Sequence, residues 1–257
     1  MRATANATGI GQAVRRKEDL RLLTGRGCFG DDIALPGMAH AVIVRSPHAH
    51  ARLASIDKTA ALAAAGVFTV LTGAEYVADG LAPIPHNPGL SAPPDVQART
   101  RGFLPIATTH LPLPVDETRY VGEPVAIIVA DSIAAAKDAA ELLHICYDPL
   151  PAVTRATDAL KPAAPQLWEI APGNLCIDIE LGDEAATATA FAGAAHVVKL
   201  ETWAQRVTGA PMEPRTNVAD YDPVTRQYTL YTGSGRGVAK VRLDLAEVLG
   251  VPPEQVR

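Results

Sequence analysis

The strongest structural signal in the sequence is the apolar run EPVAIIVA at residues 123–130, which DSIAAAKDAAELLH follows at once. A continuous apolar run of this length is typical of a strand buried on both faces. The second segment predicts a helix that Asp131 or Ser132 caps. Its apolar residues recur at helical spacing: Ile133, Ala136, Ala140 and Leu143. ICYDPLPAV then predicts another strand, which completes a β-α-β unit.

The segments before this unit also alternate between strand and helix signals. Residues 37–57 are rich in strand-forming side chains, and VFTVLTG at 67–73 predicts a second buried strand. Between them KTAALAAAG predicts a short helix that Gly66 ends in the left-handed conformation. Residues 81–115 instead hold many prolines, which lack the N–H donor that a helix or a central strand needs. We expect a long ordered excursion there.

The second half of the chain predicts a further mixture of strands and one helix. HVVKLETW at 196–203 alternates apolar and charged residues, as in a half-buried strand. NVADYDPVTRQYTLYT at 217–232 predicts a hairpin with its turn at DPVTR. VAKVRLDLAEVLG predicts a final helix that ends at Gly250. The fold class that these signals indicate is α+β, in two domains joined near residue 160.

Composition excludes several classes of protein. The net charge of −5 over 257 residues argues against a nucleic-acid partner, which usually requires a basic face. No run of eighteen apolar residues predicts a membrane span, and the N-terminus lacks the apolar segment of a secretory signal. We therefore expect a cytoplasmic protein. Its three cysteines (Cys28, Cys146 and Cys176) are widely spaced, which favours ordinary thiols over a disulfide framework or an iron–sulfur cluster.

The segment TGSGRGVAK at 232–240 lies between the last predicted strand and the final helix, where phosphate-binding loops are often found. It lacks the Gly-Lys-Ser/Thr ending of a Walker loop. Its glycines are spaced G-x-G-x-G rather than G-x-G-x-x-G, and the preceding strand belongs to a hairpin, so a dinucleotide fingerprint also fits poorly. A free helix N-terminus nevertheless favours an anion through its backbone donors.

Two other groups of polar residues carry possible chemistry. His48 and His50, two apart, would face one side of a strand and could bind a metal, although no third ligand is near in sequence; we favour a surface or packing role. Glu213 and Arg215 flank a proline in PMEPR. They present either a carboxylate to a site or an ion pair that fixes a tight bend, and we favour the ion pair.

Five segments, taken in order, resemble the large, molybdenum-cofactor subunit of the xanthine dehydrogenase/aldehyde oxidase family, which includes aerobic carbon monoxide dehydrogenases. The likeness runs from about residue 9 to residue 257. Its segments are RLLTGRGCFGDDIALPGMAHAVIVRSPHAHARLASID, GVFTVLTGAE, RYVGEPVAIIVADSIAAAKDAAELLHICYDPLPAV, PMEPRTNVADYD and the final strand and helix. No single segment is decisive, but their common order makes chance similarity an inadequate explanation.

The resemblance implies a domain order. Residues 1–23 would be an N-terminal arm, 24–150 an α/β hammerhead domain, 151–175 a linker, and 176–257 the start of a molybdopterin-binding domain. It also implies a molybdenum–molybdopterin cofactor that this chain alone would not hold. The expected partners are the remainder of the large subunit, an iron–sulfur subunit and an FAD subunit.

The sequence departs from the family pattern in two ways. Family members commonly place a glutamine that contacts the molybdenum centre where this chain has Arg236, which is always charged and cannot accept a hydrogen bond. The family's glycine-rich segment and its glutamate general base do not fall within the 257 residues, so no catalytic residue is assigned. The candidate cofactor-binding residues are Gly235, Arg236 and Gly237, with Glu213 a weaker candidate.

These features lead to two hypotheses. The favoured one is the N-terminal part of a molybdenum hydroxylase large subunit, active on an aldehyde, an N-heterocycle or carbon monoxide once the remaining part completes it. The alternative is a non-catalytic scaffold subunit that docks an iron–sulfur partner.

Overall fold

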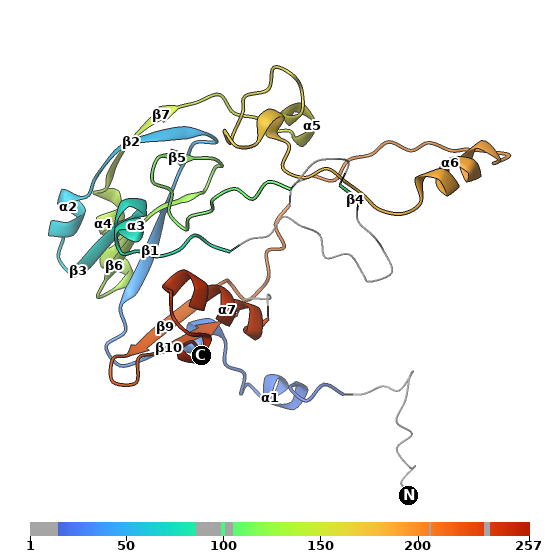
Figure 1. The fold of residues 1–257 in the computed structure, drawn as a ribbon. Helices are drawn as coiled ribbons and strands as arrows, with labels where there is room; N and C mark the ends of the chain where they lie inside the picture. Colours follow the sequence, from blue (N-terminus) through green and yellow to red (C-terminus); the bar gives the residue numbers. More distant parts are fainter. Residues whose placement is uncertain (1–14, 86–98, 101–104, 206, 234–236) are drawn as a thin grey trace, which may run out of the picture. The chain divides into compact units, whose positions relative to one another are not determined.

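The structure is a computed structural model that describes residues 15–85, 99–100, 105–205, 207–233 and 237–257. The described residues fall into two compact units, a larger one within 37–208 and 236–257 and a smaller one within 1–36 and 209–235. Each unit therefore combines segments that are far apart in the sequence (Figure 1). No helix among the described residues is long and apolar enough to cross a membrane.

The larger unit contains a sheet of three antiparallel strands with the order β1-β6-β3. Its strands are β1 (His40–Arg45), β6 (Pro124–Ala130) and β3 (Val67–Thr72). Helix α4 (Ile133–Glu141) packs across one face of this sheet, beside α2 (Thr59–Ala63) (Figure 1). Ser132 caps α4, because its side chain accepts the Ala135 N–H at 3.2 Å. The helix and its cap confirm the sequence prediction.

The central strand β6 is apolar on both faces because each face contacts a different apolar environment. Ile128 is fully buried and lies between Val42 of β1 and Val70 of β3, on the face that α4 and α2 cover. Its neighbour Ile127 pairs with Ile43 and Leu71 on the opposite face. A continuous apolar run, rather than an alternating one, is the pattern expected of such a strand.

A second antiparallel sheet in the same unit has the order β5-β2-β7. Its strands are β2 (Ala51–Asp57), β5 (Glu117–Thr118) and β7 (His144–Pro149). The β-α-β unit predicted at residues 123–153 is therefore divided between sheets, since β6 and β7 pair with different neighbours. Local sequence predicts that a segment forms a strand. It does not predict which strand pairs with it, because pairing depends on contacts between distant parts of the chain.

Helix α3 (Gly73–Ala78) follows β3 through a capping box, in which Thr72 and Glu75 hydrogen-bond reciprocally to the backbone. The Glu75 carboxylate accepts the Thr72 N–H at 2.9 Å and also forms an ion pair with Lys58. Hydrogen bonding from Lys58 is the main reason that the pKa of Glu75 falls to about 2. This carboxylate therefore joins the start of α2, the end of β3 and the start of α3.

Replacing Glu75 with glutamine is expected to lower the free energy of unfolding by about 1 kcal/mol at pH 7, after allowance for a partly exposed ion pair. Because the folded-state pKa lies below the ordinary value of 4.5, this stabilisation is fully present above about pH 4.5. It is lost as the pH falls towards 2. Urea unfolding at several pH values should therefore show wild type and E75Q converging in acid. E141Q, at an exposed position, is the control, and an equal difference at every pH would contradict the assignment.

The remaining short elements of the larger unit connect the sheets and extend beyond them. They are β4 (Arg99–Thr100), paired with β8 (Ile179–Glu180), and α5 (Ala156–Ala159), η2 (Pro172–Asn174), α6 (Glu184–Ala192), α7 (Val238–Leu249) and η3 (Pro253–Gln255). Helix α7 ends at Gly250, whose φ of 64° is left-handed, as predicted. Gly66 takes the predicted left-handed conformation, with a φ of 81°. It does not end α2, however, because that helix already ends at Ala63, three residues earlier.

The smaller unit is built on a β-hairpin of β9 (Asn217–Asp222) and β10 (Gln227–Thr232), as the sequence predicts. Asp222 accepts the Val224 N–H and the Thr225 hydroxyl, and Arg226 takes a left-handed φ of 57°, so these residues make the turn. The N-terminal part of this unit contributes α1 (Asp19–Leu23) and η1 (Gly30–Asp32).

The predicted strand at residues 196–203 is wrong for this structure, which has neither helix nor strand there. All ten residues at 196–205 are exposed, and no strand in the described part of the chain pairs with them. A strand requires a partner for its backbone, and a favourable sequence cannot supply one by itself.

Candidate cofactor-binding site

The N-terminus of α7 forms the C-terminal end of the predicted glycine-rich segment. Gly237 precedes the helix with a φ of 82°, a conformation that favours glycine, and a side chain added there would meet no atom within 4 Å. The first turn of α7 contains no acidic residue and no side chain caps it. Its first backbone N–H groups are therefore left without helical partners and attract negative charge.

The start of the same loop, Gly233, lies in the smaller unit beside Glu213. A Cβ atom added at Gly233 would lie 3.2 Å from the Glu213 carboxylate oxygen Oε1. The same oxygen accepts the backbone N–H of Gly30 at 3.2 Å. Glu213 thus joins the end of the hairpin to the N-terminal segment. No ion pair links it to Arg215 within the described residues, so the predicted bend-fixing ion pair is wrong.

The structure describes only some of the predicted site residues. Gly235 and Arg236 lie outside the described residues, so their role stays a prediction. Glu213 is brought beside Gly233, at the base of the loop, while Gly237 begins α7 in the other compact unit. The sequence did not single out Gly30. A Cβ there would lie 1.8 Å from the Thr216 hydroxyl oxygen, which is itself buried without a hydrogen-bond partner. The only signal for this contact would have been the glycine in CFGDD.

These observations are compatible with an anionic cofactor. Backbone donors at the end of a helix with no acid in its first turn suit the phosphate of a pterin cofactor, and Gly237 leaves space for close approach. Side-chain ligands for a metal ion are not gathered in the same way, since the described residues contain no cluster of three or more His, Cys, Asp or Glu side chains. The chain thus fits an organic anion held by backbone groups.

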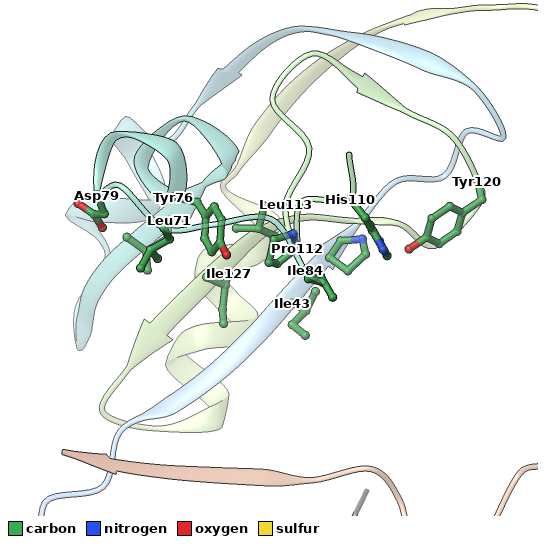
Figure 2. A pocket seen from close by; sticks show the side chains of 12 residues that line it. Ile43, Leu71, Tyr76, Asp79, Ile84, His110, Pro112, Leu113, Tyr120 and Ile127 are labelled. Atoms are coloured by element: carbon green, nitrogen blue, oxygen red, sulfur yellow. The ribbon is translucent and has the colours of Figure 1, made fainter. Parts of the chain in front are cut away.

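The larger unit also contains an apolar pocket of about 530 Å³ on the Ile127 face of the first sheet (Figure 2). Figure 2 shows Asp79 and Tyr120 at its two ends, with Ile43, Leu113 and Ile127 between them. Its polar lining residues are Asp79, His110, Tyr120 and Tyr76, whose hydroxyl donates to Ala82 O at 2.5 Å. Small-molecule sites normally combine apolar walls with several convergent polar groups. The described lining contains neither Lys nor Arg, so it offers no fixed positive charge for the phosphate of a pterin.

The charged residues Glu117, Arg119 and Glu123 line a second cavity and contact groups of the chain around it. The Arg119 guanidinium lies 3.7 Å from the centre of the Trp168 ring and donates to Glu117 O at 3.1 Å. The buried Glu123 accepts the Arg119 backbone N–H at 2.5 Å. Since these groups satisfy one another, they tie the 160–175 segment to β5. Sequence reasoning missed them because Arg119 and Trp168 are distant in the chain.

The predicted histidine pair is not arranged as a metal site. His48 and His50 lie in the turn between β1 and β2 rather than on a strand, so the two-residue spacing does not place them on one face. His50 is buried, with Nδ1 2.9 Å from Pro151 O and Nε2 3.6 Å from Glu117 Oε2. His50 therefore packs between β2, β5 and the segment that follows β7.

Comparison with known families accounts for nearly the whole chain. Residues 24–151 match the family described as aldehyde oxidase and xanthine dehydrogenase, a/b hammerhead domain, and residues 167–257 match the molybdopterin cofactor-binding domain. The α7 N-terminus and Glu213 both fall inside the second match. The chain belongs to the aldehyde oxidase and xanthine dehydrogenase family. It corresponds to the N-terminal portion of the molybdopterin-binding large subunit.

Individual relatives give the same result. The chain is 36% identical, over 96% of its length, to the 6-hydroxypseudooxynicotine dehydrogenase complex subunit gamma of Paenarthrobacter nicotinovorans. It is 35% identical, over 94% of its length, to the carbon monoxide dehydrogenase large chain of Hydrogenophaga pseudoflava. Among solved structures it resembles quinoline 2-oxidoreductase from Pseudomonas putida 86, with 36% identity and a TM-score of 0.76 over 96% of the chain. It spans 30%, 29% and 29% of these three proteins, respectively.

Proposed function

We propose that this chain is the N-terminal part of a molybdenum hydroxylase large subunit, which oxidatively hydroxylates an aldehyde, an N-heterocycle or carbon monoxide when the rest of the subunit completes it. The observation that carries the proposal is the match of residues 167–257 to a molybdopterin cofactor-binding domain. Relatives named as a 6-hydroxypseudooxynicotine dehydrogenase subunit, a carbon monoxide dehydrogenase large chain and a quinoline 2-oxidoreductase support the same class of reaction.

In this proposal the chain's own residues hold and orient the cofactor, and the bound molybdenum centre supplies the oxidative chemistry. The first N–H groups of α7 bind a negatively charged part of the cofactor, and Gly237 permits its close approach. Within the smaller unit, Glu213 accepts the Gly30 N–H and lies beside Gly233, the residue that follows β10. Arg236, where the family has glutamine, would add a donor and a positive charge next to the cofactor.

The proposal extends to partners and location. We infer partner subunits because one relative is named as subunit gamma of a complex. The family resemblance suggests that they are an iron–sulfur subunit and an FAD subunit, which would accept the electrons. The three cysteines of this chain are free and dispersed, so they offer no cluster site of their own. Free thiols persist under reducing conditions, so the three free cysteines favour a cytoplasmic location.

The test compares two proteins made in a host that produces molybdenum cofactor. One is the chain alone; the other is the chain joined in frame to the part of the Hydrogenophaga large chain that it does not match. We expect the joined protein to bind molybdenum stoichiometrically by metal analysis and to oxidise an aldehyde or N-heterocycle with an artificial electron acceptor. We expect the chain alone to contain almost none.

Stoichiometric molybdenum in the isolated monomer would contradict the need for a completing part. The scaffold alternative predicts a different pattern. An iron–sulfur subunit would co-purify with the chain, and hydroxylase activity of the complex would be unaffected by R236A. A parallel R236Q variant, which restores the family residue, should retain or raise activity if Arg236 contacts the cofactor.

A further inference from the structure

Within the larger unit, the segment of residues 81–85 (LAPIP) contacts both helix α3 and the C-terminal end of helix α7. The Ala82 N–H donates to Val248 O of α7 at 2.9 Å. The Ala82 carbonyl oxygen accepts the hydroxyl of Tyr76, which belongs to α3, at 2.5 Å. Burial raises the pKa of Tyr76, so its hydroxyl keeps the proton that it donates. Ala82 therefore links the two helices through both of its backbone polar groups.

The Ala82 N–H serves a carbonyl group that α7 cannot satisfy by itself. The last four carbonyl groups of a helix have no N–H partner within it, and Val248 is the last residue but one of α7. The Gly250 N–H that caps the helix bonds the carbonyl oxygens of Ala246 and Glu247 instead. The hydrogen bond from Ala82 thus attaches the C-terminal end of α7 to the rest of the larger unit.

The 81–85 segment is stiff, so it can transmit the position of one helix to the other. Pro83 and Pro85 each have a fixed φ, and a residue before proline is confined to extended conformations. The Ile84 N–H donates to His110 O at 2.8 Å, which holds the middle of the segment. The segment is therefore a firm connection between α3 and α7 rather than a loose loop.

We propose that Tyr76 is a positioning residue for the cofactor site, because it fixes Ala82 and, through Ala82, the C-terminal end of α7. This inference rests on the proposed function, in which the N-terminus of the same helix binds the cofactor. An α-helix is stiff, and the 12 residues of α7 span about 18 Å. A displacement of its C-terminal end therefore changes the place or the tilt of Gly237 and of the backbone donors that follow it.

The alternative is that Tyr76 only contributes its ring to the wall of the apolar pocket (Figure 2). Y76F separates the two roles, because it keeps the ring and removes the hydroxyl. The matched control is Y147F, which removes the hydroxyl of another partly buried tyrosine of the same unit. Tyr147 lies on β7 in the other sheet, where its ring centre is 4.8 Å from that of His48.

Hydrogen–deuterium exchange of the chain alone, read by mass spectrometry, tests the connection without any cofactor. In Y76F, the peptides that carry Ala82 and the C-terminal half of α7 should exchange about 2- to 10-fold faster than in wild type, the effect of one lost hydrogen bond. Peptides of β6 should keep the wild-type rate, and Y147F should leave α7 unchanged. Unchanged exchange at Ala82 and α7 in Y76F would overturn the inference. Equal acceleration in β6 would show a general loss of stability and would also overturn it.

The chain joined to the unmatched part of the Hydrogenophaga large chain tests the effect on the site. In Y76F we expect a lower molybdenum content or a changed electron paramagnetic resonance signal of the reduced molybdenum centre, at the wild-type yield of folded protein. Y147F should match wild type. Wild-type content and signal in Y76F, despite faster exchange, would overturn the positioning role. Absence of molybdenum from the joined wild-type protein would instead contradict the proposed function, and exchange of the chain alone would then decide whether Tyr76 fixes α7.

Discussion

Replacing Gly73 with alanine is expected to destabilise the larger unit by about 3 kcal/mol or to prevent its folding. A Cβ atom at Gly73 would lie 2.5 Å from Pro114 O and 2.6 Å from Leu113 O. Both are backbone atoms, so no side-chain rotation relieves the overlap, and either the start of α3 or the 113–114 segment must move. Soluble yield and the midpoint of thermal unfolding, followed by circular dichroism, measure the effect.

The control is G193A at the end of α6, where an added Cβ would meet Thr189 O at 3.5 Å, an ordinary contact. Its midpoint should stay within a few degrees of wild type. Equal stability of G73A and G193A would show that the close approach of the 113–114 segment to α3 does not exist in solution.

Replacing Ile128 with alanine should cost about 2–5 kcal/mol of unfolding free energy, because the substitution leaves a cavity in the core. Ile128 is fully buried in the central strand, between Val42 and Val70 and against α4. Urea denaturation gives the free energy, and the urea dependence should remain close to that of wild type if the native state stays compact.

I43A is the matched control for this change. Ile43 lies on the neighbouring strand of the same sheet but faces the apolar pocket, and it is 44% exposed. Its substitution should cost clearly less than that of Ile128. The opposite order would mean that the pocket face, rather than the α4 face, is the tightly packed core.

Much of the larger unit follows from local sequence. The apolar run that becomes β6, the Ser132-capped α4 and the hairpin of β9 and β10 were all predictable, because caps, turns and periodicity act within a few residues. Strand pairing was not. The division of β6 and β7 between two sheets, and the unpaired 196–205 segment, depend on contacts across the chain that periodicity does not encode.

The candidate site was predictable only in outline. The glycine-rich loop before α7 is a local pattern, and Gly237 indeed takes a positive φ at the helix start. The partner of Glu213 was not predictable, because Gly30 lies far away in the sequence and carries no chemical signal. The neighbouring Arg215 suggested an ion pair, yet a backbone N–H is the group that the carboxylate binds.

The hydrogen bond from Gly30 to Glu213 spans 183 residues, and this separation has a consequence for biosynthesis. At about 5–20 residues per second, Glu213 leaves the ribosome roughly 10–40 s after Gly30. The N-terminal segment must wait through that interval, while the sheets of the larger unit become available for folding. Slowing translation between residues 37 and 208 should therefore prolong the protease sensitivity of the nascent N-terminus without altering the sheets already formed.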